Sequence, residues 1–321
     1  MAAARFAIAV SAIALGAGAA SAQTSTNTNE VTQTGTNNSL AVDNARLGND
    51  NNRSSAVQNG RDNSATVLQI GDFNASQLRQ VGDRNRVLHT EEGDFQRAES
   101  FQNGNDDFSA IRQRGQFNSA TVDQQGNRNV SQVAQGVDAS SSGDFTFSQF
   151  FDSSIGATRV GNDNRATVSQ IGNDFFSTVR QRAAANSAVA ASNNSATVRQ
   201  NGQGNSSSIV QESRGNLAEI FQFGGGNSAA LQNVSAITQA NAGATSADNP
   251  LSNNRASVSQ AAQSNSSTIR QDGLNNNAEV SQGIGQLLVT QVTQTGSTSN
   301  LARVAQSVSY THLTLPTKRI V

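Results

Sequence analysis

Residues 63–74 read NSATVLQIGDFN, and two near-copies follow, NSATVDQQG at residues 118–126 and NSATVRQNG at residues 194–202. Three close copies of one alternating pattern indicate a repeated structural unit. Aligned on this stretch, the sequence has an eleven-residue unit, N-x-A-x-V-x-Q-x-G-x-x, after which the next unit begins at once. The properties of this unit therefore decide the fold.

The unit recurs without a gap over a long tract. Eight consecutive units begin at Asn52, Asn63, Asn74, Asn85, Gln96, Asp107, Asn118 and Asn129. Shorter tracts begin at Ser153, Asn164 and Phe175, at Asn194, Asn205, Asn216 and Asn227, and at Asn254, Asn265 and Asn276, with an early copy at Asn27 and a late one at Asn300. Eight units in one register exceed chance.

The odd and even positions of the unit differ in character. Positions 1, 3, 5 and 7 carry Asn, a small residue, a β-branched or apolar residue and Gln, whereas positions 2, 4 and 6 are mostly Ser, Thr or Arg. A period of two predicts a strand with one buried face, because successive side chains point to opposite faces. The x-G-x-x-N segment is predicted to form the turn.

The last position of the unit indicates how many strands make one circuit. Phe occupies it every twenty-two residues, at Phe73, Phe95 and Phe117. The units between carry charges there instead, at Asp62, Arg84, Asp106 and Arg128. Two strands per rung would stack the Phe rings about 4.8 Å apart along one edge and the charges along the other. The sequence therefore predicts an all-β, two-sheet parallel β-solenoid of cross-β type, with about 22 residues per two-strand rung, which stacks into amyloid fibres.

The buried amides are expected to form ladders along the solenoid axis. A buried amide is costly unless it is hydrogen-bonded, and each Gln can bond to its copy in the next rung. The predicted structural ladder residues are Gln58, Gln69, Gln80, Gln102, Gln113, Gln124, Gln170, Gln181, Gln200, Gln211, Gln222, Gln260, Gln271 and Gln282. The predicted turn residues are Gly60, Gly71, Gly82, Gly104, Gly115 and Gly126.

One unit departs from the pattern at two buried positions. In the unit from Asn85, His89 takes the apolar position and Glu91 the amide position. An ionisable group in a dry core could act as a pH-sensitive brake on assembly. A tolerated imperfection or a local bulge is the alternative interpretation.

The ends of the chain and the gaps in the repeat suggest how it is divided. Residues 1–22 contain Arg5, an apolar run and an Ala-Ser-Ala cleavage site, which predicts a secretory signal peptide. Residues 309–321, SYTHLTLPTKRIV, resemble a cloning junction and are interpreted as a non-native tail. The expected division is a signal peptide (1–22), an N-terminal segment with an early repeat (23–51), solenoid repeats (52–308) with loops near 138–153, 188–193 and 240–253, and the tail (309–321).

Composition narrows the class of protein. Of the 321 residues, 35% are hydrophobic and 14% charged, with a net charge of −1 and no Cys. Low charge with many amides is typical of cross-β chains rather than of highly charged disordered ones. The near-neutral balance gives no reason to expect a nucleic-acid partner, no later segment is apolar enough to predict a transmembrane span, and disulfides are excluded.

The motif Gln-x-Gly-x-x-Asn followed by x-Ala-x-x-x-Gln, iterated in a chain without Cys, resembles the curlin repeat of bacterial curli fibre subunits. The resemblance spans residues 27–308, with QIGDFNASQLRQ (69–80) and QFGGGNSAALQN (222–233) among the closest passages. It implies a functional amyloid: a subunit exported through the periplasm of a Gram-negative bacterium that forms adhesive, pilus-like surface fibres of the biofilm matrix. The implied partners are further copies of itself, a nucleating curlin-like subunit and an outer-membrane secretion pore. The interruptions leave open whether the chain is a major or a minor subunit.

An enzyme is the first competing function. Catalytic β-helices need acidic or basic side chains clustered on one face, whereas Asp here lies chiefly in turns, as at Asp72, Asp83 and Asp94. Two His and no Cys give no metal-binding pattern, and FGGGN at residues 223–227 precedes a predicted strand rather than the helix that a phosphate loop requires. No catalytic residue, cofactor or metal site is therefore expected.

Two non-enzymatic alternatives remain open at this point. A monomeric β-solenoid surface adhesin or ligand-binding protein is suggested by outward-facing Thr66, Thr121, Thr167, Thr197 and Thr268. Other units carry Gln77, Leu88, Glu219 and Glu279 at the same position, which argues against a flat Thr array. The second alternative is a disordered, Gln/Asn-rich secreted chain.

Overall fold

The computed structural model describes residues 27–44, 50–136, 162–182, 193–225, 232–240, 252–283, 288–296 and 299–307. The predicted signal peptide, the predicted tail and nearly all of the three expected loops lie outside these ranges. The described residues form strands joined by turns, without a helix, so the predicted all-β class is confirmed. In the same residues no helix is long and apolar enough to cross a membrane.

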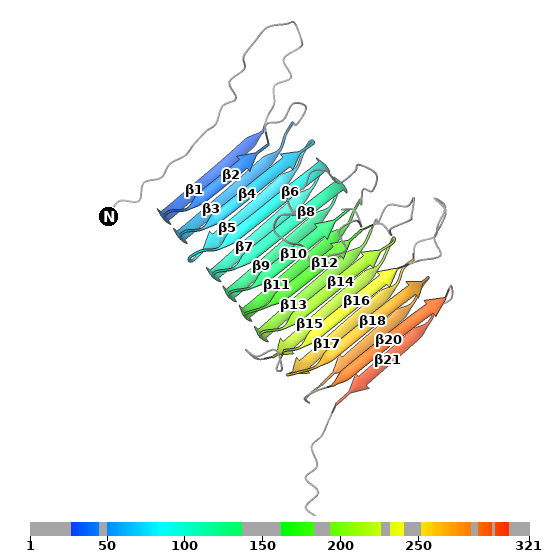
Figure 1. Ribbon diagram of the computed structural model, residues 1–321. Helices are drawn as coiled ribbons and strands as arrows, with labels where there is room; N and C mark the ends of the chain where they lie inside the picture. The colour runs from blue at the N-terminus through cyan, green and yellow to red at the C-terminus, as the bar shows by residue number, and fades with distance from the viewer. Residues whose placement is uncertain are drawn as a thin grey trace, which may run out of the picture.

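The strands are parallel and alternate between two sheets along the chain (Figure 1). Sheet A contains the eleven odd-numbered strands: β1 (Thr28–Thr36), β3 (Arg53–Arg61), β5 (Ala75–Val81), β7 (Arg97–Asn105), β9 (Ser119–Asn127), β11 (Arg165–Asn173), β13 (Ser195–Gln203), β15 (Leu217–Gly224), β17 (Arg255–Ala262), β19 (Asn277–Gln282) and β21 (Leu301–Gln306). Sheet B contains the ten even-numbered strands: β2 (Ser39–Asp43), β4 (Ser64–Ile70), β6 (Arg86–Asp94), β8 (Phe108–Gln116), β10 (Val130–Gln135), β12 (Phe176–Gln181), β14 (Ser206–Glu212), β16 (Val234–Ala240), β18 (Ser266–Gly273) and β20 (Val289–Gly296).

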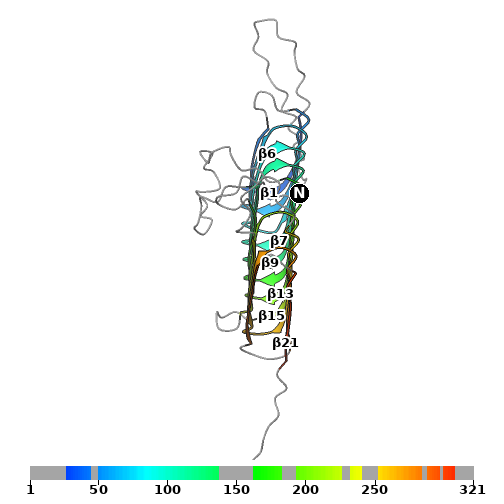
Figure 2. The same ribbon diagram turned by 90° about the vertical axis from the view of Figure 1, so that its right-hand side faces the viewer.

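One strand from each sheet makes a rung, and successive rungs stack in register. Each strand pairs with the strand two places along the chain, so Gln58 lies beside Gln80 and Gln80 beside Gln102. Seen edge-on, the sheets face each other as two thin layers (Figure 2). The predicted two-sheet parallel β-solenoid with 22-residue rungs is confirmed, and a three-sided β-helix is excluded.

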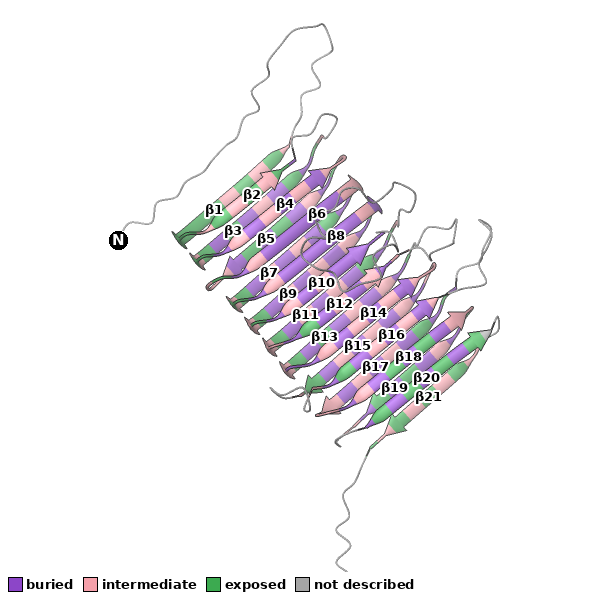
Figure 3. Ribbon diagram, viewed as in Figure 1, coloured by how far each residue is buried: buried purple, intermediate pink, exposed green. Residues whose placement is uncertain are grey.

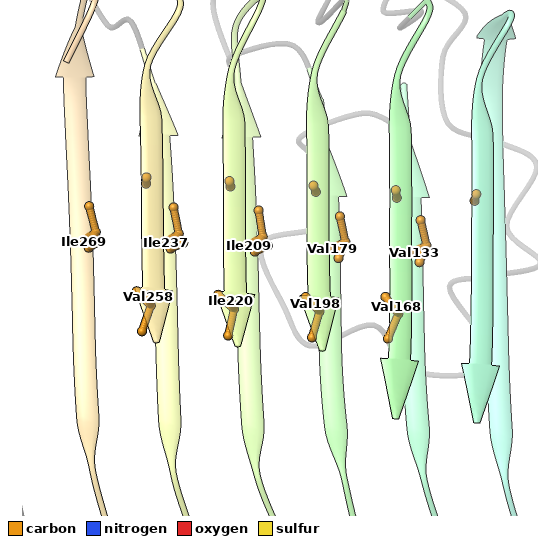
Figure 4. Packing of buried hydrophobic residues seen from close by; sticks show 14 of the residues in the cluster. Val133, Val168, Val179, Val198, Ile209, Ile220, Ile237, Val258 and Ile269 are labelled. Carbon is orange, nitrogen blue, oxygen red and sulfur yellow. The ribbon is translucent and has the colours of Figure 1, made fainter. Parts of the chain in front are cut away.

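The core lies between the sheets and repeats with the rungs. Buried and more exposed residues alternate along the strands, which gives the banding of Figure 3. In the described units from Ile111 onward, the fifth position stacks one β-branched residue on the next, and Figure 4 shows Val179, Ile209 and Ile237 aligned in sheet B. Such side chains pack well on a pleated surface. Each contributes on the order of 1.5–3 kcal/mol of burial, so stability depends on stacking many rungs.

The register continues across the interruptions of the repeat. Gln124 bonds to Gln170, and Gln135 to Gln181, although 46 residues separate each pair. The chain therefore resumes its place in both sheets on the far side of residues 137–161, which lie outside the described ranges.

Three boundaries differ from the expected ones. The unit expected from Asn227 is wrong, because β16 begins at Val234 with Asn233 in the first position of the unit. A further unit precedes the one at Asn300, with Leu288 in the position that Asn usually takes. Strands β1 and β2 pair with β3 and β4, so residues 27–44 already form a rung and the solenoid begins before Asn52.

Candidate assembly site: amide ladders, edges and open ends

An unbroken Gln ladder runs through sheet A. Each Gln at position 7 donates its Nε2 proton to Oε1 of the Gln in the next rung, over distances of 2.6–3.1 Å. The members are Gln33, Gln58, Gln80, Gln102, Gln124, Gln170, Gln200, Gln222, Gln260, Gln282 and Gln306. Most of these Nε2 groups also donate to a backbone carbonyl, as Gln80 does to Ser64 at 3.1 Å. The buried amides are thus satisfied by their own copies.

Sheet B has a second Gln ladder with one break. From Gln113 onward each Nε2 donates to the next Oε1 over 2.8–3.0 Å, through Gln113, Gln135, Gln181, Gln211, Gln239, Gln271 and Gln294. Before the break, Gln69 donates to Oε2 of Glu91 at 3.2 Å. Oε1 of Glu91 and Oε1 of Gln113 have no hydrogen-bond partner, although both atoms are buried. Glu91 therefore accepts a hydrogen bond from Gln69 in the preceding rung, but no hydrogen bond links it to Gln113 in the next rung.

Asn side chains at position 1 tie the turns of successive rungs together. Asn63 donates to the carbonyl of Gly82 at 2.8 Å, and its Oδ1 accepts the backbone N–H of Asn85 at 3.0 Å. A Cβ on Gly82 would lie 2.0 Å from the carbonyl oxygen of Gly104 in the next rung. Since φ of Gly82 is also +108°, both backbone angle and close approach require glycine there.

The residue with φ in the left-handed helical region is the last of the unit, not the predicted glycine. Asp62, Phe73, Arg84, Phe95 and their equivalents have φ between 55° and 60° in the uninterrupted tract. Five of the predicted turn glycines also have positive φ, at Gly60, Gly71, Gly82, Gly115 and Gly126, whereas Gly104 does not. The glycines lie at or just beyond the strand ends, two residues before the left-handed residue.

The two edges of the solenoid carry different side chains. On one edge Phe73, Phe95 and Phe117 stack with ring centroids 5.0 Å apart, as predicted, and remain about half exposed. On the other edge the predicted charges pair two by two: Arg84 bonds to Asp106 at 2.6 Å, and Arg128 bonds to Asp174 at 2.6 Å. The Arg84 guanidinium lowers the pKa of Asp106. Such exposed pairs contribute little to stability.

Two carboxyls and one imidazole are buried between the sheets and in the turns. His89 bridges the hydroxyls of Ser76 (2.6 Å) and Ser100 (2.7 Å), and burial lowers its pKa to about 3. Burial raises the pKa of Glu91 to about 8 and that of Asp107, which stands in an Asn position, to about 7. All three groups are thus driven towards their neutral forms.

The solenoid has two open ends in the described residues. β1 and β2 at one end, and β20 and β21 at the other, each pair with a single strand. The end strands β1 and β21 have no fully buried residue. The ends are complementary, because all ladder bonds point the same way: Gln33 donates into the stack at the first rung, and Gln306 accepts at the last.

The outward Thr residues form a short row only. Thr121, Thr167 and Thr197 lie in register on adjacent strands of sheet A. Glu99 and Glu219 occupy the same position on the flanking strands and end the row. In the described ranges, no group of three or more His, Cys, Asp or Glu side chains is arranged to hold a metal ion.

This geometry defines a parallel β-solenoid built from amide-laddered repeats. Comparison with known protein families matches residues 191–224 to the family described as the curlin associated repeat. The matched segment contains β13, β14 and β15, and the resemblance to curlins is confirmed there. No curated protein matches the chain at a significant level.

Five ladder residues in the structure go beyond those predicted: Gln33, Gln135, Gln239, Gln294 and Gln306. Gln33 follows the pattern in the early unit from Asn27. Gln135 and Gln306 follow the pattern in the units from Asn129 and Asn300 and could have been found from it. Gln239 and Gln294 belong to units whose starts are displaced or lack Asn, and strand pairing alone identifies them.

Proposed function

We propose that the protein is a secreted structural subunit that polymerises end to end into curli-type amyloid fibres for cell adhesion and the biofilm matrix. The observation that carries this proposal is the pair of complementary open ends on a solenoid of in-register rungs. Unpaired strands at an end accept a further strand through backbone hydrogen bonds. The curlin associated repeat at residues 191–224 supports the same function.

The ends suggest how two copies would join. β21 of one copy would pair with β1 of the next, which continues sheet A. In the described residues sheet B has one strand fewer than sheet A, so the direct contact between copies is made in sheet A. Gln306 would donate to Oε1 of Gln33 in the next copy, in the direction that every ladder bond of sheet A takes. A head-to-tail contact that does not close on itself generates an open filament. No bond-making chemistry, cofactor or metal is part of this function.

The resemblance to curlins supplies the cellular part of the proposal. The predicted signal peptide would direct the chain to the periplasm of a Gram-negative bacterium, and an outer-membrane secretion pore would release it to the cell surface. A nucleating curlin-like subunit would start the fibres, and further copies of this chain would extend them.

Seeded polymerisation of the purified mature chain tests the proposal. We expect a lag in the thioflavin signal that preformed fibres abolish, and fibres with a cross-β diffraction pattern. A chain that is β-rich at once and stays monomeric would instead be the solenoid adhesin, and one that stays coil would be the disordered chain.

An end variant tests the mechanism of growth. The backbone N–H of Arg53 donates to the next rung at Asn74, and Leu301 holds the equivalent position in the end strand β21. Leu301→Pro would remove this donor while Pro remains tolerable at the start of an edge strand. We expect slower elongation than with Leu301→Ser, which keeps the N–H. Equal elongation rates would contradict growth through β21.

A further inference from the structure

The break in the sheet B ladder places two hydrogen-bond acceptors face to face. Glu91 on β6 and Gln113 on β8 occupy the same register position. Oε1 of each side chain lies buried without a partner, whereas the other Oε1 atoms of this ladder, from Gln135 to Gln294, accept a bond from the preceding rung. A buried acceptor without a donor is destabilising, so this rung lacks a hydrogen atom that a Gln would supply.

We propose that Glu91 is a neutral carboxylic acid in the folded solenoid and donates its proton to Oε1 of Gln113, which makes assembly of this rung proton-dependent. A single proton then satisfies both unpaired oxygens and restores the direction of the ladder. An ionised Glu91 would instead direct a buried negative charge at an acceptor, the costliest arrangement available to it.

The surroundings of Glu91 supply no cation to stabilise the ionised form. The groups that face it from β4, β5 and β8 are the neutral side chains of Gln69, Ser76 and Gln113. On its own strand, His89 is held between two serines and is neutral, because burial lowers its pKa to about 3.

The nearest cations interact with a different carboxylate. Arg112 and Arg114 on β8 lie 3.6 Å and 3.3 Å from Glu92, the next residue along β6. Successive residues of a strand point to opposite faces, so this charged cluster is separated from Glu91 by the sheet. Burial raises the pKa of Glu91 to about 8, in agreement with the geometry.

The sign of the pH dependence follows from the raised pKa. An exposed Glu in the unfolded chain titrates near 4.5, and folded Glu91 near 8, so folding takes up a proton between these values. The contribution of the bond is complete below about pH 4.5 and is lost as the pH rises through about 8. Within this window, each unit of pH lowers the folded-to-unfolded ratio about tenfold. Faster fibre growth in mildly acidic than in alkaline medium would follow, and this consequence rests on the proposed function. The protonation of Glu91 does not rest on it.

Infrared spectroscopy of the folded chain tests the protonation directly. We place the test in an Asp107→Asn background, which removes the other buried carboxyl with a raised pKa. At pH 7.5 we expect the C=O stretch of a protonated carboxyl, which titrates away with a midpoint near 8 and is absent when Glu91→Gln is added. Glu219→Gln, which changes an outward-facing Glu of β15, should keep the band. An unchanged band when Glu91→Gln is added, or no band in the Asp107→Asn background, would overturn the proposal. If the band behaves as expected but seeding fails, the proposed function falls and this inference stands.

Moving the carboxyl to another position of the same ladder provides a second experiment. Glu91→Gln should fold and assemble. Its folded-to-unfolded ratio, divided by that of the wild type, should rise about tenfold per pH unit between pH 5 and 8. Adding Gln135→Glu to that variant should restore the pH dependence, because Gln135 both accepts from Gln113 and donates to Gln181 in the same ladder. Failure of Glu91→Gln to fold, or a double variant whose stability is no more pH-dependent than that of Glu91→Gln, would contradict a proton-completed ladder.

Discussion

Replacement of one ladder amide should weaken the whole solenoid by a measurable amount. Gln102 lies in the middle of the sheet A ladder, where it accepts from Gln80 at 3.0 Å and donates to Gln124 at 2.9 Å. Gln102→Leu keeps most of the side-chain volume but removes both ladder bonds and the bond that Gln102 donates to the carbonyl of Arg86 at 3.1 Å. Gln80 retains its bond to a backbone carbonyl, whereas Oε1 of Gln124 loses the donor that reaches it in the wild type.

The expected cost follows mainly from Oε1 of Gln124, which is left buried without a donor. A buried acceptor left without a donor costs about 1–3 kcal/mol, and the apolar Leu offsets part of the loss. We therefore expect a destabilisation of about 2 kcal/mol, which lowers the folded-to-unfolded ratio by an order of magnitude or more. The urea concentration that removes half of the β-sheet circular dichroism signal reports this change.

Gln125→Leu is the matched control, since Gln125 lies in the adjacent strand β9 with its side chain exposed and bonded to Asp123 at 3.3 Å. It should change the free energy of unfolding by less than about 0.5 kcal/mol, as surface substitutions usually do. If Gln102→Leu were no less stable than Gln125→Leu, the amide ladder would contribute no net free energy. The apolar stacks alone would then hold the rungs together.

Three further predictions concern the turns and the edge. Gly82→Ala should cost several kcal/mol, because the new Cβ would lie 2.0 Å from the carbonyl oxygen of Gly104, whereas Gly283→Ala, with its nearest contact at 3.5 Å, should be well tolerated in the same urea titration. Phe95→Asn should change the free energy of unfolding by less than about 1 kcal/mol, because the loss of ring stacking is offset by relief of the left-handed φ of 57°. A destabilisation above about 2 kcal/mol would show that the stack is a main stabilising element. Asp107→Asn should stabilise the solenoid at pH 8 and much less at pH 4. The reason is that the pKa of the wild-type carboxyl is raised to about 7, so its contribution to stability is lost as the pH rises through that value. Equal effects at both pH values would show that the protonation of Asp107 is not coupled to folding.

The fold followed from the sequence because its signals are local and repeated. The period of two identifies each strand, and the spacing of Phe73, Phe95 and Phe117 identifies the two-strand rung. The period of two is present within single units, so eight consecutive copies reinforce one interpretation.

What the sequence left unclear depends on contacts between rungs. The need for glycine at Gly82 comes chiefly from the carbonyl of Gly104, twenty-two residues further along, and a turn propensity cannot express this contact. The start of β16 at Val234 is fixed by pairing with β14 and β18. The eleven-residue spacing after Asn216 leads to Asn227 instead, although that unit has Asn233 rather than Gln at position 7. Glu91 stood out as an irregular residue, but only the common direction of the Gln bonds shows which atom lacks a hydrogen.

Near-identical rungs raise the question of why a strand does not pair with the wrong copy. Skipping one rung would enlarge the closed loop from about 22 to about 44 residues, which costs only about 0.6 kcal/mol. The Gln, Asn and Phe stacks would also be satisfied by the wrong partner. The charged edge would not: Arg84 would then lie against Arg128, and Asp106 against Asp174, where the native register pairs Arg with Asp. Each exposed pair stabilises weakly, but a skipped rung exchanges attraction for repulsion along the charged part of the edge, from Asp62 to Asp174. The alternation of sign every rung therefore contributes more to the choice of register than to the stability of the finished solenoid.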